Sequence, residues 1–214
     1  TADNNTAVGD SALKANTTGT NNVAIGIDAM LSSTTANSNI GIGRQALYTN
    51  TTSTGNTAVG ALALNVSTGA NNSAFGCGSL RSNTTGADNT GVGKDGLLAN
   101  TTGCRNVAVG SCALKANTTG VENQAIGYLS MNSNTEGGCN VAIGAALQSN
   151  TTGGNNVGIG FIALSNNTTA SNNTAVGRSA LQENTVGHSN TGIGQGALQA
   201  TTDGDQNTAV GNSA

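Results

Sequence analysis

The sequence lacks proline and tryptophan altogether and has few other large side chains. Its 214 residues include two Tyr, two Phe and one His, and charged residues make up only 8% of the chain, against about 25% in ordinary soluble domains. The hydrophobic 36% is mostly Ala, Val, Ile and Leu. Such a chain cannot fill a thick hydrophobic core, but it can fill a thin core that is repeated many times.

The sparse charge excludes several classes of partner. The net charge is −3, and no basic stripe with interleaved aromatic residues is present, so nothing supports nucleic-acid binding. No apolar run approaches the ~20 residues of a membrane-spanning helix. Disorder is disfavoured, because disordered chains usually combine high net charge with a lack of regularly spaced β-branched residues. We expect neither a nucleic-acid partner nor a membrane span.

Catalytic and metal-binding groups are equally scarce. His188 is the only histidine, and one histidine at a variable corner makes neither a triad nor a metal site. The acidic residues do not recur as a calcium-binding nonapeptide would require. Residues 91–96 match G-x-G-x-x-G, but the βαβ context of a dinucleotide site is missing. We therefore expect a non-enzyme without metal or cofactor.

What the sequence has in abundance is a repeat. The motif that begins as Asn5-Thr6-Ala7-Val8-Gly9 occurs in thirteen copies, and its closing glycines fall at 9, 26, 43, 60, 76, 93, 110, 127, 144, 160, 177, 194 and 211. The step is 17 residues, with two steps of 16. A period this short and regular is typical of a solenoid, in which each repeat is one coil stacked on its neighbours.

The motif itself predicts a short β-strand in every coil. The residue two places before the closing glycine is always Ala or Gly, and the next is always Val, Ile or, once, Phe75. Strand residues alternate between two faces. We predict that Val and Ile point into the coil and that the Ala/Gly row, from Ala7 to Ala209, points out. The Asn that opens each motif is expected to form a hydrogen-bonded ladder.

Each strand is followed by a Leu or Met and then by a Thr-rich corner. The apolar residue, as in Leu13 or Met30, is predicted to be the second core residue of its coil. The corner repeats Asn-Thr-Thr-Gly, in which Asn and Gly permit the positive φ of a sharp turn. The second Thr is replaced by Glu136, Val186 and Asp203, so we expect it to face water, with the first Thr half-turned inward.

These features predict an all-β fold, a parallel β-solenoid of 12 to 13 coils with a 17-residue repeat. Residues 1–214 form a single repeat domain in this interpretation. Because the pattern begins and ends without an obvious cap, and solenoids need covered ends, we expect it to be a piece of a longer chain.

The Asn-x-Ala-Ile-Gly motif resembles the head repeat of YadA-type trimeric autotransporter adhesins and the repeats of phage tail fibres that end in an intramolecular chaperone. The resemblance covers the whole chain, although the Thr-Thr-Gly block makes this repeat longer. It implies a left-handed parallel β-roll and the association of three chains. The alternative function is therefore the shaft or head of a surface adhesin or tail fibre, a homo-oligomer joined through the Ala/Gly row.

A second resemblance is architectural, to Thr-rich solenoid antifreeze proteins, in which regular Thr rows order water and bind ice. It makes a secreted or cell-surface ice-binding protein the leading hypothesis, with ice as partner. Thr18, Thr35, Thr52, Thr68, Thr85, Thr102 and Thr119 are predicted to form one unbroken row. The expected ice-binding residues are Thr17, Thr18, Thr34, Thr35, Thr51, Thr52, Thr68, Thr84, Thr85, Thr101, Thr102, Thr118, Thr119, Thr151, Thr152, Thr168 and Thr169.

Two further features concern chemistry at the corners. Many Asn-Thr-Thr blocks are N-glycosylation sequons, which would place glycans on the same Thr rows. Of the four cysteines, Cys77 with Cys112 and Cys104 with Cys139 lie about two coils apart. That is ~9.6 Å, beyond the ~7 Å reach of a disulfide. A Cys104–Cys112 pair stays open, and free thiols are expected otherwise.

Overall fold

The computed structural model describes residues 2–214 and confirms the predicted all-β solenoid of parallel strands with a repeat of about 17 residues. Each motif forms one three-residue strand, and no helix that could cross a bilayer occurs among the described residues. The strands are β1 (Thr6–Val8), β2 (Val23–Ile25), β3 (Ile40–Ile42), β4 (Thr57–Val59), β5 (Ser73–Phe75), β6 (Thr90–Val92), β7 (Val107–Val109), β8 (Gln124–Ile126), β9 (Val141–Ile143), β10 (Val157–Ile159), β11 (Thr174–Val176), β12 (Thr191–Ile193) and β13 (Thr208–Val210).

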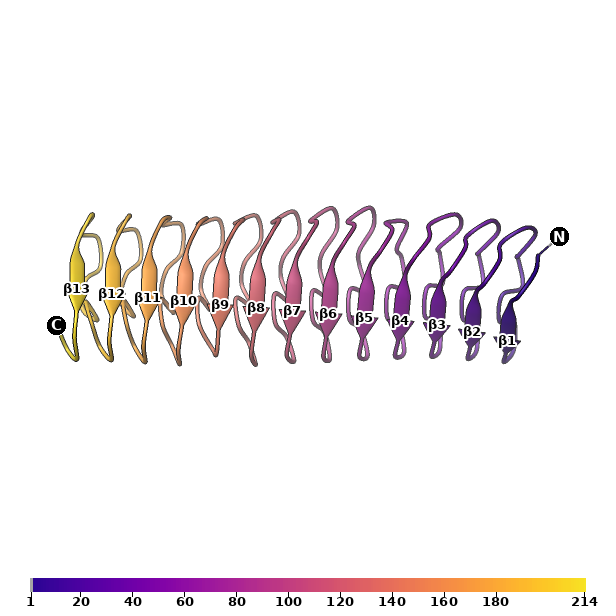
Figure 1. The fold of residues 1–214 in the computed structure, drawn as a ribbon, viewed down its shortest axis with the longest axis horizontal. Coiled ribbons are helices and arrows are strands. Elements are labelled where there is room, and N and C mark those ends of the chain that lie inside the picture. Colours follow the sequence, from indigo (N-terminus) through magenta and orange to yellow (C-terminus); the bar gives the residue numbers. More distant parts are fainter. Residues whose placement is uncertain (1) are drawn as a thin grey trace. The chain divides into compact units, whose positions relative to one another are not determined.

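The chain divides into two compact units, the first ending at Arg105 and the second comprising Asn106–Ala214. The first contains β1 to β6 and the second β7 to β13. Within each unit every strand pairs in parallel with the next, and equivalent motif positions are always opposite each other (Figure 1). The register therefore converts each repeat position into a straight row of equivalent side chains.

Each coil turns through residues in the left-handed backbone region. The closing glycines have φ between 91° and 142°, where residues with a side chain are strained. They also stack closely, since a Cβ built on Gly110 would lie 2.5 Å from the carbonyl oxygen of Gly127. The core Leu is also left-handed, as at Leu114 with φ 49°. Its N–H donates to Ser130 O in the next coil at 3.0 Å, so stacking stabilises this backbone.

The interior contains a Leu/Met row and small side chains, and the predicted orientation of the strands is wrong. Ala24 in β2 and Ala142 in β9 are fully buried, whereas Ile25 and Ile143 are 37% and 39% exposed. The Ala/Gly row thus points inward and Val or Ile points outward. The reason is width, because the coil already holds a fully buried Leu or Met, as at Met30, and only a methyl group or hydrogen fits beside it. The second core residue was predicted correctly.

Two ladders of buried asparagine fill the rest of the interior. The Asn that opens each strand forms the expected ladder: Asn140 donates through Nδ2 to Asn123 Oδ1 at 3.1 Å and to Gly153 O at 2.9 Å. The corner Asn forms a second ladder, in which Asn134 donates to Asn117 Oδ1 and Asn150 donates to Asn134 Oδ1, each at 2.8 Å. Neither the corner Asn nor the corner Gly, as at Gly120, has the predicted positive φ. The corner Asn therefore serves as a buried polar bridge and not as a left-handed turn residue.

Candidate functional site

The Thr-rich corner is held in place by the corner Asn ladder and by hydrogen bonds between coils. We call the row of first threonines the inner corner row. Thr151 donates through Oγ1 to Thr168 O at 3.0 Å, and Thr168 donates to Thr185 O at 3.2 Å. The row is half-buried from Thr118 to Thr185, as predicted. The prediction is wrong at Thr17, Thr51, Thr84 and Thr202, which are exposed. The hydroxyl protons of the row are therefore used to join the coils.

The row of second threonines, here the outer corner row, faces solvent as predicted. Its exposed members are Thr18, Thr35, Thr52, Thr85, Thr102, Thr119, Thr152 and Thr169. Glu136, Val186 and Asp203 occupy the same row and are also exposed. Every side chain of this row can reach water, but the row is chemically regular only over short stretches.

The predicted membership of Thr68 in the outer corner row is wrong. Thr68 donates through both its N–H and Oγ1 to Thr84 O, at 2.7 and 2.8 Å. The same pattern joins Thr17 to Thr34. Thr68 therefore belongs to the inner corner row, and Ser67 takes the place of the corner Asn. The residue missing from this 16-residue step is the outer Thr, so the outer corner row is interrupted between Thr52 and Thr85.

The corner Asn residues of the sequons are not accessible. Asn50, Asn83, Asn150 and Asn167 are fully buried, and their Nδ2 groups donate to backbone or ladder oxygens. A folded coil does not present these amides for glycosylation. The conflict between glycans and the Thr rows therefore does not arise at these four positions.

The strands present a second regular surface, which the sequence interpretation missed. We call it the sheet face, consisting of the first and third residues of every strand. The first positions are Thr6, Val23, Ile40, Thr57, Ser73, Thr90, Val107, Gln124, Val141, Val157, Thr174, Thr191 and Thr208. The third positions are Val8, Ile25, Ile42, Val59, Phe75, Val92, Val109, Ile126, Ile143, Ile159, Val176, Ile193 and Val210.

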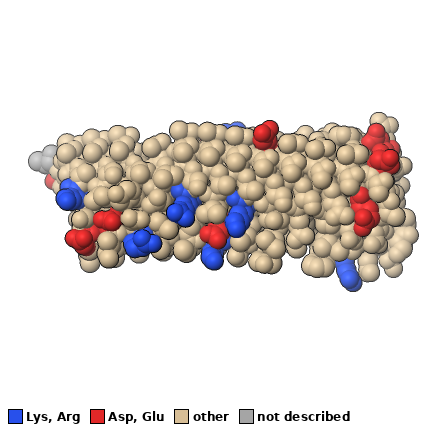
Figure 2. Space-filling model, turned by 180° about the vertical axis from the view of Figure 1, so that it is seen from behind, with Lys and Arg blue, Asp and Glu red and all other residues tan. Residues whose placement is uncertain are grey.

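The third positions of the sheet face are apolar, the first positions mix Val and Ile with Thr, Ser and Gln, and neither set carries a charge. Ile126, Ile143 and Ile193 are 41%, 39% and 40% exposed, and Phe75 is 43% exposed. No strand in the described part of the chain contains a charged residue. The charged side chains lie on the turns and corners, where Figure 2 shows them scattered over the side opposite to the view of Figure 1. The sheet face thus combines β-branched side chains, regular spacing and absence of charge.

The remaining candidates show no catalytic arrangement. Residues 91–96 form the end of β6 and a turn, without a helix. The exposed His188 accepts a hydrogen bond through Nδ1 from the Ser171 N–H at 3.0 Å, and its own N–H donates to Asp205 Oδ1 at 2.6 Å, so it links corners. Among residues 2–214 no group of three or more His, Cys, Asp or Glu could hold a metal, and no disulfide joins the cysteines.

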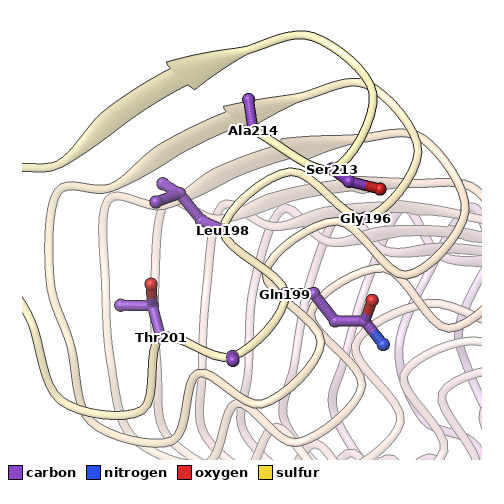
Figure 3. A pocket seen from close by; sticks show the side chains of 7 residues that line it. Gly196, Leu198, Gln199, Thr201, Ser213 and Ala214 are labelled. Carbon is purple, nitrogen blue, oxygen red and sulfur yellow. The ribbon is translucent and has the colours of Figure 1, made fainter.

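One hollow of about 490 Å³ lies in the second unit. Figure 3 shows Leu198, Gln199 and Thr201 around it, with Ser213 and Ala214 on another side. No acidic, basic or thiol side chain lines it, so it has no acid–base pair and no metal ligand set. The regular surfaces are therefore stronger candidates than this hollow.

Comparison with known proteins does not relate this chain to a known family. No protein-family model matches the chain, and no curated protein or solved structure is significantly similar to it.

Proposed function

We propose that this chain is a non-catalytic, extracellular structural module that associates with further copies of itself through the sheet face. The proposal rests on one observation, the two outward rows of mostly β-branched side chains without a charge. This agrees with the shaft or head of an adhesin or tail fibre that the motif resembles. The contact surface differs from the expected one, because the Ala/Gly row is inside the coil.

The sheet face has the size of a common functional surface patch. In the second unit seven strands at ~4.8 Å spacing, each of three residues at ~3.3 Å, cover roughly 330 Å². The largest apolar patch of a typical soluble monomer covers about 300–600 Å² and is often functional. The sheet face lies within this range, so its regular spacing and lack of charge, and not its area, favour a contact surface. Copies of the same chain are the natural partner, because their rows have the same spacing.

Association can be tested by placing a charge on the sheet face. Sedimentation velocity at micromolar concentration should show an oligomer for the unchanged chain and mostly monomer for Ile143→Asp, because the carboxylate would be buried without a partner. Val186→Asp is the matched control. Val186 is 48% exposed on the outer corner row, where Asp203 occurs naturally, so this variant should remain oligomeric. A monomeric unchanged chain would refute the proposal.

Ice binding through the outer corner row is the second candidate. The observation in its favour is that all eight threonines of the outer corner row are exposed. In the first unit no larger side chain stands among them. We rank it second because the inner corner row donates its hydroxyl protons to the backbone and the outer row is interrupted. Its mechanism would be adsorption, with methyl and hydroxyl groups holding an ice-like water layer.

Thermal hysteresis and ice-crystal shape test the second candidate directly. Thr102→Tyr would place a ring in the middle of the outer corner row and should abolish any hysteresis without unfolding the chain. Thr54→Tyr is the control, since Thr54 is exposed but belongs to neither corner row. Absence of hysteresis and of shaped crystals in the unchanged protein would eliminate this function.

A further inference from the structure

Among the strands of residues 2–214, Gln124 is the only amide on the sheet face. It is the first residue of β8 and is exposed. Its partners in register are Val107 on β7 and Val141 on β9, so it interrupts an apolar stretch of the first row. Ile126, two residues further along β8, lies on the same face and is 41% exposed. The amide therefore stands among aliphatic side chains.

The side chain of Gln124 makes no hydrogen bond within residues 2–214, although its backbone N–H donates to Asn140 O at 2.8 Å. Other polar residues of the first row are Thr or Ser, whose hydroxyls can bond locally to backbone groups. A Gln amide has two donors and an acceptor, and its aliphatic neighbours offer none. If the sheet face is buried by another copy, the only polar side chain able to satisfy this amide is one that the other copy supplies.

We infer that Gln124 sets the register in which copies of this chain pack. This inference rests on the proposed self-association. With copies parallel and in register, the Gln124 side chains of adjacent copies meet and hydrogen-bond to each other. A slip by one strand places each amide against Val107 or Val141 of the other copy, where it is buried without a partner. A single buried polar residue fixes register in coiled coils in the same way, at a cost in stability.

The equal spacing of the coils makes such a determinant necessary. Every strand lies ~4.8 Å from the next, and Val or Ile dominates the third row, so a one-strand slip preserves nearly all apolar contacts. Phe75, in the first unit, is the only residue of the third row that is neither Val nor Ile. In the second unit Gln124 is the one carboxamide of the first row, whose other polar residues are Thr174, Thr191 and Thr208.

Disulfide trapping between copies tests the inference. In a background with the four native cysteines replaced by Ser, Thr174→Cys and Thr191→Cys are made as separate proteins, one of them ¹⁵N-labelled, then mixed and oxidised. Thr174 and Thr191 are register partners on β11 and β12. Mass spectrometry then compares same-position disulfides with 174–191 disulfides, which report a slip of one strand.

With Gln124 present, same-position disulfides should dominate about tenfold or more, the ratio that corresponds to one unsatisfied amide. With Gln124→Val, association should persist or tighten and the 174–191 fraction should rise several-fold. Val fits because Val107 and Val141 occupy the flanking positions. Gln195→Val, the same change at an exposed site outside the strands, should leave the ratio unchanged.

The outcomes separate the inference from the function on which it rests. An oligomer whose disulfide ratio is the same with and without Gln124 overturns the register role and leaves self-association intact. An unchanged chain that sediments as a monomer overturns both the register role and the self-association. A Gln124→Val chain that becomes monomeric also overturns the inference, because a register determinant is not required for association itself.

Discussion

At the scale of single residues, the coil depends on backbone conformations that only stacking makes favourable. Besides the closing glycine, left-handed φ values recur at three positions of most coils, including the core Leu, as at Leu147 with φ 51° and Leu181 with φ 50°. A left-handed residue with a side chain costs roughly 1–2 kcal/mol. Hydrogen bonds between coils offset this cost, such as the one from Leu181 N–H to Ala197 O at 2.9 Å.

The closing glycines are predicted to tolerate no side chain. Gly110→Ala should lower the free energy of unfolding by about 3 kcal/mol or more, because a φ of 137° is accessible essentially only to Gly and the new Cβ would lie 2.5 Å from Gly127 O. Denaturant unfolding measures this. Gly158→Ala is the control, since Ala stands at the same place in β9 and β11. Equal effects of the two changes would contradict this account.

The orientation of the strand residues could have been predicted at this scale. The first and third residues of a strand point to the same side. The first position accepts Gln124 and Ser73 besides Val and Thr, which indicates that it faces outward, and the third must then do the same. Ala or Gly in the middle indicates a narrow interior. Hydrophobicity alone suggested the opposite, because Val and Ile are usually buried.

At the scale of the repeated elements, the Asn ladders specify how coils join. Ser33 occupies a corner Asn position, and its buried Oγ has no hydrogen-bond partner. The strand-opening ladder was predictable because its Asn never varies. The corner ladder was missed, because Asn beside Thr and Gly is equally typical of a turn.

Ser33→Asn is expected to raise the free energy of unfolding by about 1 kcal/mol, because it adds a ladder hydrogen bond and satisfies an orphan site. Asn134→Ala should lower it by roughly 2 kcal/mol, because it removes the Nδ2 donor to Asn117 and the acceptor of Asn150. Thermal and urea unfolding report both. Ser133→Ala, next to the ladder, should change little. A stabilised Asn134→Ala would show that the ladder is not a source of stability.

The position of the missing residue in the shortened coil could not be predicted from the sequence. Ser67-Thr68-Gly69 can be aligned either with Thr-Thr-Gly or with Asn-Thr and a deleted second Thr. Residue similarity favours the first alignment. The hydrogen bonds of Thr68 require the second, because the donor that joins one coil to the next belongs to the inner corner row.

At the scale of the whole molecule, the proposed function depends on which rows face outward. The sequence was sufficient for the repeat, the parallel solenoid and the Leu row. It was not sufficient for the sheet face. Because the same orientation recurs in every strand, one wrong orientation places the whole Val/Ile row inside the coil and the whole Ala/Gly row outside. The composition of each surface is seen only when the coils are stacked and equivalent residues form rows, so it cannot be read from one copy of the motif.

Self-association through the sheet face should be insensitive to salt. The face contains no charged residue, so it forms no ion pair that salt could weaken by screening. Salts such as sulfate preserve or strengthen apolar contacts. Sedimentation equilibrium in 50 mM and in about 0.5 M sodium sulfate should give the same or a tighter association. Dissociation at high salt would indicate that charged corners, and not the sheet face, form the contact.

The Asn ladders also make the solenoid electrically directional. In both ladders the amide nitrogen of one coil donates to the amide oxygen of the preceding coil, as in Asn134 to Asn117 and Asn140 to Asn123. The side-chain dipoles within a unit therefore point the same way and add, much as peptide dipoles do in a helix. The column leaves an oxygen unmatched where the next coil has no Asn, as at Asn184 Oδ1. Any coil added after such a point extends the column only if it brings an amide donor.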